Sequence, residues 1–125
     1  MGEYTDVMAA SDLASGAMTE LEVGDDTLLV AHVGDAFLAT QGRCPHLKGH
    51  LARGTLEGTV VTCPRHGSQF DLTDGRVIRW TDWTGVAEAV DEALRHPRPL
   101  VTYEVRVDGG RVLIGPEKVT TTAID

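Results

Sequence analysis

The sequence predicts an all-β fold, an antiparallel sandwich or barrel, on two observations. Short apolar and β-branched segments recur along most of the 125 residues, and turns rich in Gly and Asp separate them. Two of these turns, Gly34-Asp35 and Asp108-Gly109-Gly110, lie between such segments and indicate hairpins. A chain of this length with 42% hydrophobic residues can bury one core, so we expect residues 1–125 to form a single domain.

The expected strands share a short length, apolar or β-branched residues and turn residues at their ends. The segment 59–62 is β-branched throughout (TVVT) and leads directly into Cys63. The segments 100–107 and 111–114 are joined by the second hairpin turn. The strands are expected at residues 17–23, 27–33, 36–40, 59–62, 76–80, 100–107 and 111–114.

One segment departs from this pattern and predicts a short α-helix at about residues 85–95. Its apolar residues recur at i, i+3, i+4, i+7 and i+8, which places them on one stripe of an amphipathic helix. His96-Pro97 should end the helix, because the residue before a proline avoids the helical region. We expect Trp80 and Trp83 to pack this helix onto the sheet, with an exposed docking contact as the alternative. The stripe consists of Val86, Ala89, Val90, Ala93 and Leu94.

The composition excludes several classes of partner. The net charge of −8 and the pI near 5.0 disfavour nucleic acid and anionic membranes, and they are compatible with steering toward a basic protein surface. The sequence has neither an apolar run long enough to span a membrane nor a recognisable secretory signal. We therefore expect a cytoplasmic protein with no membrane or nucleic-acid partner, and a monomer.

Two short motifs carry the chemistry of the chain. Cys44-Pro45-His46 is followed, after sixteen residues, by Cys63-Pro64-Arg65-His66, and these are the only two cysteines. Thiolate and imidazole ligands suit zinc or an iron–sulfur cluster rather than calcium or magnesium. A structural zinc site of two cysteines and two histidines has the same ligand count, which leaves a zinc-stabilised binding module as one interpretation. However, the single residue between Cys44 and His46 is shorter than the usual spacing in zinc sites.

The segment from Cys44 to Val77 resembles the cluster-binding segment of Rieske proteins, especially bacterial Rieske-type ferredoxins. The resemblance implies a Rieske-type antiparallel β-sandwich, in which a cluster-binding subdomain at about residues 42–80 is inserted into a larger base. It also implies one 2Fe–2S cluster per chain, bound by two cysteines and two histidines. By this resemblance Cys44 and Cys63 hold the buried iron, and His46 and His66 hold the outer iron. The short helix is an addition to the family's usual fold.

Residues near the ligands refine this expectation. The family's high-potential members carry a disulfide at the positions of Gly49 and Arg65, and a tyrosine at the position of Phe70. Ser68 occupies the position of a serine that hydrogen-bonds a cluster sulfide, and Pro64 and Gly67 also adjoin the ligands. Fewer hydrogen bonds to sulfur lower the midpoint potential, so we expect a value in the lower half of the Rieske range of about −150 to +300 mV.

The resemblance also implies the function. The chain is expected to be a soluble one-electron carrier, not an enzyme, that passes electrons from a reductase to a terminal oxygenase. It contains no dinucleotide-binding Gly-x-Gly-x-x-Gly motif and no separate domain for a mononuclear iron. No catalytic residues are therefore assigned. The alternative within the same fold is the small subunit of a reductase complex, similar to that of nitrite reductase. The resemblance also suggests that Pro97 and Pro99 correspond to the proline-containing loop that covers the cluster in the family, although the inserted helix shifts the alignment there.

Overall fold

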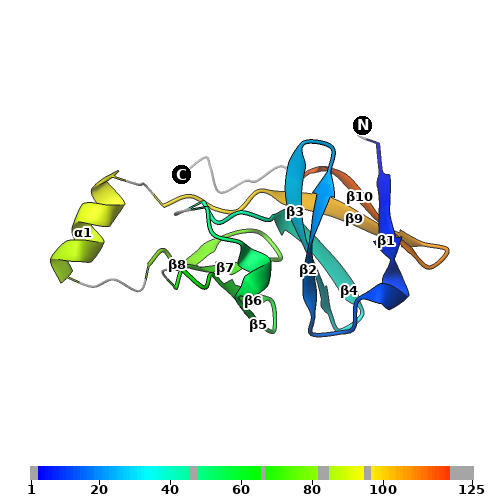
Figure 1. The fold of residues 1–125 in the computed structure, drawn as a ribbon, viewed down its shortest axis with the longest axis horizontal. Helices are drawn as coiled ribbons and strands as arrows, with labels where there is room; N and C mark the ends of the chain where they lie inside the picture. Colours follow the sequence, from blue (N-terminus) through cyan, green and yellow to red (C-terminus); the bar gives the residue numbers. More distant parts are fainter. Residues whose placement is uncertain (1–2, 46–47, 66, 82–84, 95–96, 119–125) are drawn as a thin grey trace.

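The described residues fold into two antiparallel sheets and one α-helix, which confirms the expected all-β class (Figure 1). The computed structural model describes residues 3–45, 48–65, 67–81, 85–94 and 97–118. The larger sheet has the strand order β1-β10-β9-β4-β3-β2, and the smaller has the order β5-β6-β7-β8. The strands are β1 (Thr5–Ala9), β2 (Met18–Val23), β3 (Asp26–Val33), β4 (Ala36–Gln41), β5 (Thr55–Glu57), β6 (Val60–Thr62), β7 (Gln69–Asp71), β8 (Val77–Arg79), β9 (Thr102–Asp108) and β10 (Arg111–Glu117). The helix is α1 (Gly85–Leu94), and two 3₁₀ turns are η1 (Ala10–Asp12) and η2 (Leu51–Arg53).

All seven expected strands form, with ends that differ from the predicted ones by up to three residues. Both predicted hairpins are present, because β3 pairs with β4 and β9 pairs with β10 in antiparallel register. Three further strands, β1, β5 and β7, have no counterpart in the prediction. Each is held by pairing with a neighbour: β1 with β10, β5 with β6, and β7 with both β6 and β8.

Strand β3 lies between two apolar cores, which explains its continuous apolar sequence. Leu29 and Ala31 belong to a core that also contains Cys44, Cys63 and residues of the smaller sheet. Leu28 and Val30 point to the opposite face and join a second core within the larger sheet. Successive side chains of a strand alternate between faces, so a strand buried on both faces reads as an apolar run rather than an alternation.

The smaller sheet is joined to the larger one by a close backbone contact at Gly75. The amide of Leu100, just before β9, donates to the Gly75 carbonyl at 2.8 Å. Gly75 has a φ of +81°, and a Cβ built there would lie 2.3 Å from the Leu100 carbonyl oxygen. Only glycine fits this position without strain, because both the left-handed backbone and the missing side chain are required.

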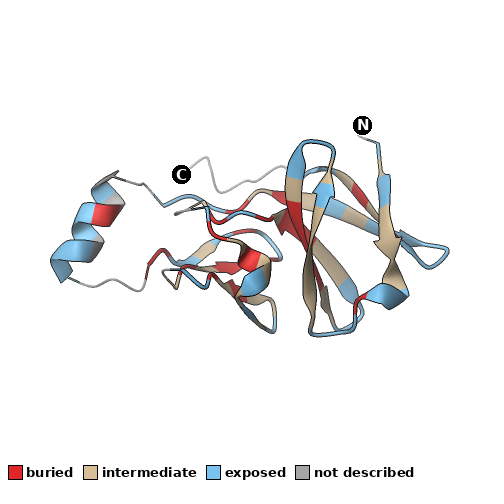
Figure 2. Cartoon of the chain, viewed as in Figure 1, coloured by how far each residue is buried: buried red, intermediate tan, exposed pale blue. Residues whose placement is uncertain are grey.

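Helix α1 forms where the sequence predicts it, but the described side chains of its apolar stripe are exposed and do not pack onto a sheet. In Figure 1 the helix projects from the end of the molecule opposite β1, and Figure 2 shows most of its described residues exposed. Val86 and Val90 are 80% and 52% exposed, whereas Asp91 is buried. These two valines therefore do not form the contact that we expected when we assigned Trp80 and Trp83 to pack the helix onto the sheet. Trp83 itself lies outside the described residues.

Trp80 is a core residue. It is 4% exposed and meets the ring of Phe70 edge-on, with 6.3 Å between ring centroids. This geometry is the usual one for buried aromatic pairs.

Within the described part of the chain, no helix has both the length and the apolar composition to cross a membrane.

Candidate metal centre

The first cysteine motif lies in a loop that leaves the end of β4. The loop is closed by a backbone hydrogen bond of 2.8 Å from the Cys44 amide to the Gly49 carbonyl, and by a bridge between Arg43 and His50. The amide of Lys48 donates to the Cys44 carbonyl at 2.7 Å, which tightens the turn within the loop. These bonds leave the Cys44 side chain buried at 1% exposure.

The second cysteine motif lies in the hairpin between β6 and β7, and it is closed in the same way. The Cys63 amide donates to the Ser68 carbonyl at 2.7 Å, again five residues further along the chain. The adjacent pair Thr62 and Gln69 is in antiparallel register, and their side chains also form a hydrogen bond of 3.1 Å. Each cysteine therefore begins a loop of the same length, with its thiol directed into the core.

The two loops meet at Gly49. A Cβ built on this glycine would lie 3.0 Å from the Cys63 Sγ and 2.8 Å from the Arg65 Cδ. The sulfur of the second loop thus touches the backbone of the first loop, which contains Cys44. The contact with Arg65 shows that the two positions used for a disulfide in high-potential relatives also adjoin here, occupied by Gly and Arg.

The described residues fit a 2Fe–2S cluster on the inner side of the site. Both cysteines are buried thiols, at 1% and 3% exposure, within one apolar core. Two soft thiolate donors that share a buried position are the donor set for the inner iron of such a cluster. His46 and His66, the predicted ligands of the outer iron, lie outside the described residues.

Ser68 and Phe70 lie where the motif leads us to expect them, below the second loop. Both side chains are completely buried. The Ser68 hydroxyl donates to the backbone carbonyl of Trp80. Because a hydroxyl has one proton to donate, this bond competes with the expected donation to a cluster sulfide, which stays a prediction. Pro64 is exposed, and Gly67 is half-buried with a φ of +71°.

Two arginines outside the motifs brace the loops at the residues next to the predicted histidine ligands. Arg98 Nη2 donates to the Pro45 carbonyl at 2.9 Å, and Arg79 Nε donates to the Gly67 carbonyl at 3.0 Å. A further bond of 2.8 Å runs from Arg43 Nε to the Lys48 carbonyl. Sequence reasoning missed these residues, since Arg98 lies 53 positions from its acceptor and no local pattern marks it.

The segment that follows α1 lies beside the first loop. A cleft of about 630 Å³ is lined by Cys44 and Pro45 on one side and by Arg98 and Pro99 on another. The correspondence of Pro97 and Pro99 with the covering loop of the family stays a prediction. Arg98 also lies 6.0 Å from the centroid of the Trp80 ring, within cation–π range.

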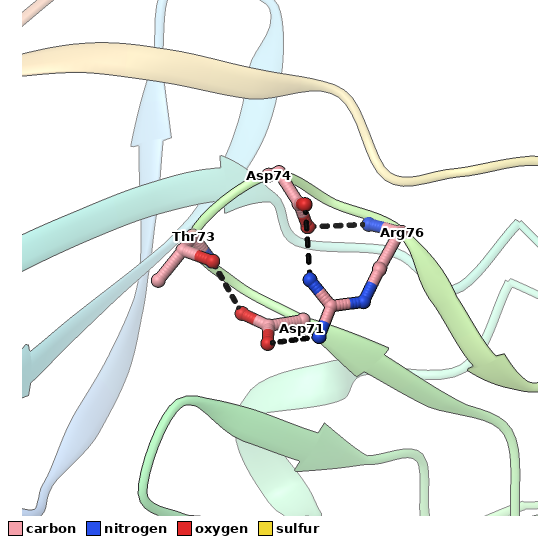
Figure 3. Close-up of polar contacts among 4 residues, drawn as sticks. All are labelled: Asp71, Thr73, Asp74 and Arg76. Carbon is pink, nitrogen blue, oxygen red and sulfur yellow. Dashed lines mark hydrogen bonds and ion pairs between the residues drawn. The ribbon is translucent and has the colours of Figure 1, made fainter. Parts of the chain in front are cut away.

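Asp71 belongs to a structural turn rather than to a reactive site (Figure 3). Its Oδ1 accepts hydrogen bonds from the amide and hydroxyl of Thr73 at 2.9 and 2.6 Å, and Arg76 Nη2 lies 3.3 Å from Oδ2. Burial alone would raise the pKa of Asp71, but hydrogen bonds from Thr73 and Thr59 and the Arg76 charge together lower it below the ordinary value of 3.8. The carboxylate therefore stays ionised and holds the turn that presents Gly75 to Leu100.

His50, the histidine nearest the motifs that we do not assign as a ligand, contacts the larger sheet. Its Nδ1 lies 2.6 Å from Glu20 Oε1 on β2, and its side chain is 33% exposed. His50 is thus half-buried and links the first loop to β2.

Comparisons with known proteins agree with this geometry. The family model described as the Rieske [2Fe-2S] domain matches residues 3–90. The ferredoxin component of biphenyl 2,3-dioxygenase from Rhodococcus jostii is 35% identical over 94% of this chain and 97% of that protein. The ferredoxin component of the alkene monooxygenase system from Xanthobacter autotrophicus is 37% identical over 92% and 83% of the two chains. A solved complex of oxygenase and ferredoxin in carbazole 1,9a-dioxygenase contains a chain with 32% identity and a TM-score of 0.73, covering 93% and 96%.

The chain belongs to the Rieske [2Fe-2S] domain family. Its cofactor is a 2Fe–2S cluster, which sets aside the zinc interpretation, and it is an electron carrier rather than a catalyst.

Proposed function

We propose that this chain is a cytoplasmic, monomeric ferredoxin that receives single electrons from a reductase and delivers them to an oxygenase component. Cys44 and Cys63 hold the inner iron of its cluster, and His46 and His66 hold the outer iron. The observation that carries the proposal is the pair of matching loops, each closed by a backbone hydrogen bond five residues after a buried cysteine. The side chains of Cys63 and Arg65 in the second loop meet the backbone of the first loop at Gly49. Relatives that match nearly the whole chain are ferredoxin components of oxygenase systems, which supports the choice of partners.

When bound, the cluster supplies reversible one-electron chemistry, and its mixed ligation raises the potential above that of four-cysteine clusters. The residues around the site shield the cysteine sulfurs from water and fix the backbone of the two loops. The core that contains Phe70 and Leu51 keeps water from the cysteine sulfurs. Arg98 and Arg79 fix the backbone on either side of the site. No described residue is needed to bind a substrate, because the electron is the only cargo.

The test is the visible and electron paramagnetic resonance spectrum of protein purified from iron-replete cells. We expect one Rieske-type cluster per chain, with a midpoint potential in the lower half of the range of about −150 to +300 mV. Cys44→Ser, Cys63→Ser, His46→Ala and His66→Ala should each lose this spectrum, whereas His50→Ala is the matched control and should retain it. A colourless protein loaded with zinc would refute the proposal.

The choice between a free carrier and a reductase subunit needs a second measurement. A free carrier should elute as a monomer from gel filtration and should be oxidised by the oxygenase component within its turnover time. Stable co-purification with a reductase, without electron delivery to an oxygenase, would favour the subunit.

A further inference from the structure

The charges of this chain are strongly segregated along the sequence. Residues 1–42 contain eight acidic and no basic residues, whereas residues 43–80 contain six basic and three acidic residues. The net charge of −8 is therefore carried mainly by the larger sheet and its hairpins, while the segment that contains both cysteine loops is basic. A partner that approaches the loops meets a charge opposite in sign to that of the whole molecule.

The basic residues around the loops form one continuous surface. The cleft lined by Cys44 and Pro45 and a second hollow, lined by Pro64 and Gly49, share Arg43 and Lys48 as common walls. Together the linings of these two hollows contain five exposed basic side chains and no acidic residue. We call this surface the basic face. Arg98 braces the first loop through the Pro45 carbonyl, and the basic face consists of the other four basic residues, Arg43, Lys48, Arg53 and Arg65.

The side-chain hydrogen bond of Arg43 leaves its charge in place, because its acceptor, the Lys48 carbonyl, is uncharged. By contrast, Arg76 and Arg111, which lie elsewhere, pair with the carboxylates of Asp74 and Asp6. The basic face is therefore available for an external anionic surface.

We propose that the basic face is the docking surface for the oxygenase component, and that the oxygenase presents a complementary acidic surface around its electron entry. This inference rests on the proposed electron-carrier function, since it places the contact at the cluster loops. It also reverses the expectation, drawn from net charge alone, of a basic partner surface. Transient electron-transfer interfaces are small, so charge complementarity contributes much of their association rate.

Local and net charge give opposite predictions for a small anionic oxidant. Electrons pass from the reduced cluster to hexacyanoferrate(III), which becomes hexacyanoferrate(II), one electron per anion. The screening length falls from about 30 Å at 0.01 M salt to about 8 Å at 0.15 M, so added salt removes whichever charge effect dominates. If the basic face governs the approach, oxidation should slow as salt is added; if the net charge of −8 governs it, oxidation should accelerate.

The experiment is stopped-flow oxidation of reduced, cluster-loaded protein by hexacyanoferrate(III) over a range of salt concentrations. We expect the wild-type rate to fall with salt, and the Lys48→Glu/Arg53→Glu variant to react about tenfold more slowly at low salt, with the salt dependence flattened or reversed. Arg106→Glu/Arg111→Glu is the control, because it changes the net charge equally in β9 and β10, near the turn that joins them and away from the loops. The control should keep the wild-type salt dependence.

The oxygenase component should show the same order of rates, with the wild type and the control reacting fast and the Lys48→Glu/Arg53→Glu variant slowly. A wild-type rate with hexacyanoferrate(III) that rises with salt, or equal effects of the two double variants, would overturn the inference. Each protein is first checked for its Rieske spectrum. A missing wild-type spectrum would refute the proposed function, whereas an intact spectrum with the wrong salt dependence would refute the basic face alone.

Discussion

At the residue scale, the hydrogen bond that Ser68 donates determines whether this residue affects stability or the midpoint potential. Its hydroxyl is buried and donates to the Trp80 carbonyl, so it ties the second loop to the end of β8. We expect Ser68→Ala to lower the free energy of unfolding by about 1–3 kcal/mol, because the buried carbonyl loses this donor. The midpoint potential should change little. Chemical denaturation and a redox titration of the same variant separate the two roles, since a fall in potential with unchanged stability would show donation to a sulfide instead.

Asp71 gives a pH-dependent prediction at the same scale. Because its folded pKa lies below the ordinary value of 3.8, its ionised form contributes stability above that value, and this contribution is lost as pH falls through the folded pKa. Asp71→Asn should therefore destabilise the protein near neutral pH by about 1–3 kcal/mol, and the difference from wild type should shrink in acid.

The control is Asp74→Asn, which removes a carboxylate from the same turn. Asp74 is 51% exposed in its ion pair with Arg76, so its loss should cost only about 0–1 kcal/mol. Thermal unfolding of both variants across the acid range makes the comparison. Equal costs, or a difference for Asp71→Asn that persists at the lowest pH, would contradict the role of this carboxylate in the turn.

At the scale of elements, the sequence predicts those strands whose pattern is local and misses those made by pairing. The continuous apolar run of β3 and the two hairpin turns signal their strands directly. Strands β5 and β7 have three residues each, too few to show an alternation, and they exist because β6 offers edges for pairing. Strand β1 pairs with β10, more than 100 residues away, which no local window can reveal.

The residues of the candidate site also fall into two groups, those that local sequence spacing identifies and those that only the fold brings together. Cys44 and Cys63 are identified by spacing, because ligand spacing is local within each loop. Arg98, Arg79 and the Ser68–Trp80 contact depend on segments brought together by the fold, and they carry no sequence signal. For helix α1, periodicity predicts that a helix forms, but not which face meets the protein, because the exposed Val86 and Val90 reverse the usual arrangement.

This orientation leads to a prediction for α1. We expect Val86→Ser/Val90→Ser to change the free energy of unfolding by no more than about 0.5 kcal/mol, because both side chains are already exposed. Leu100→Ala, at a position with 1% exposure, is the reference and should cost about 2–5 kcal/mol. Urea denaturation measures both. A cost for the valine pair similar to that of Leu100→Ala would show that the apolar stripe packs against the protein after all.

At the scale of the whole molecule, one core connects the two sheets. Leu29 and Ala31 of the larger sheet share it with Cys44, Cys63 and Phe70, and Gly75 adds a backbone bond to Leu100. A core that draws on both sheets cannot lose one of them without exposing apolar surface of the other. The cluster-binding segment at about residues 42–80 should therefore not unfold separately, in agreement with the single domain expected for residues 1–125.

The expected outcome is one cooperative transition on heating or denaturation of the cluster-loaded protein. Loss of the visible cluster absorbance should coincide with loss of the far-ultraviolet circular dichroism of the strands. Gly75→Ala should shift both signals together to lower temperature, because the added Cβ collides with the Leu100 carbonyl at the junction of the sheets. Gly58→Ala is the matched control, since Gly58 also has a positive φ but no atom within 4 Å of its built Cβ, and it should shift the transition less. Bleaching of the cluster well before the dichroism changes would instead show that the smaller sheet opens as a unit of its own.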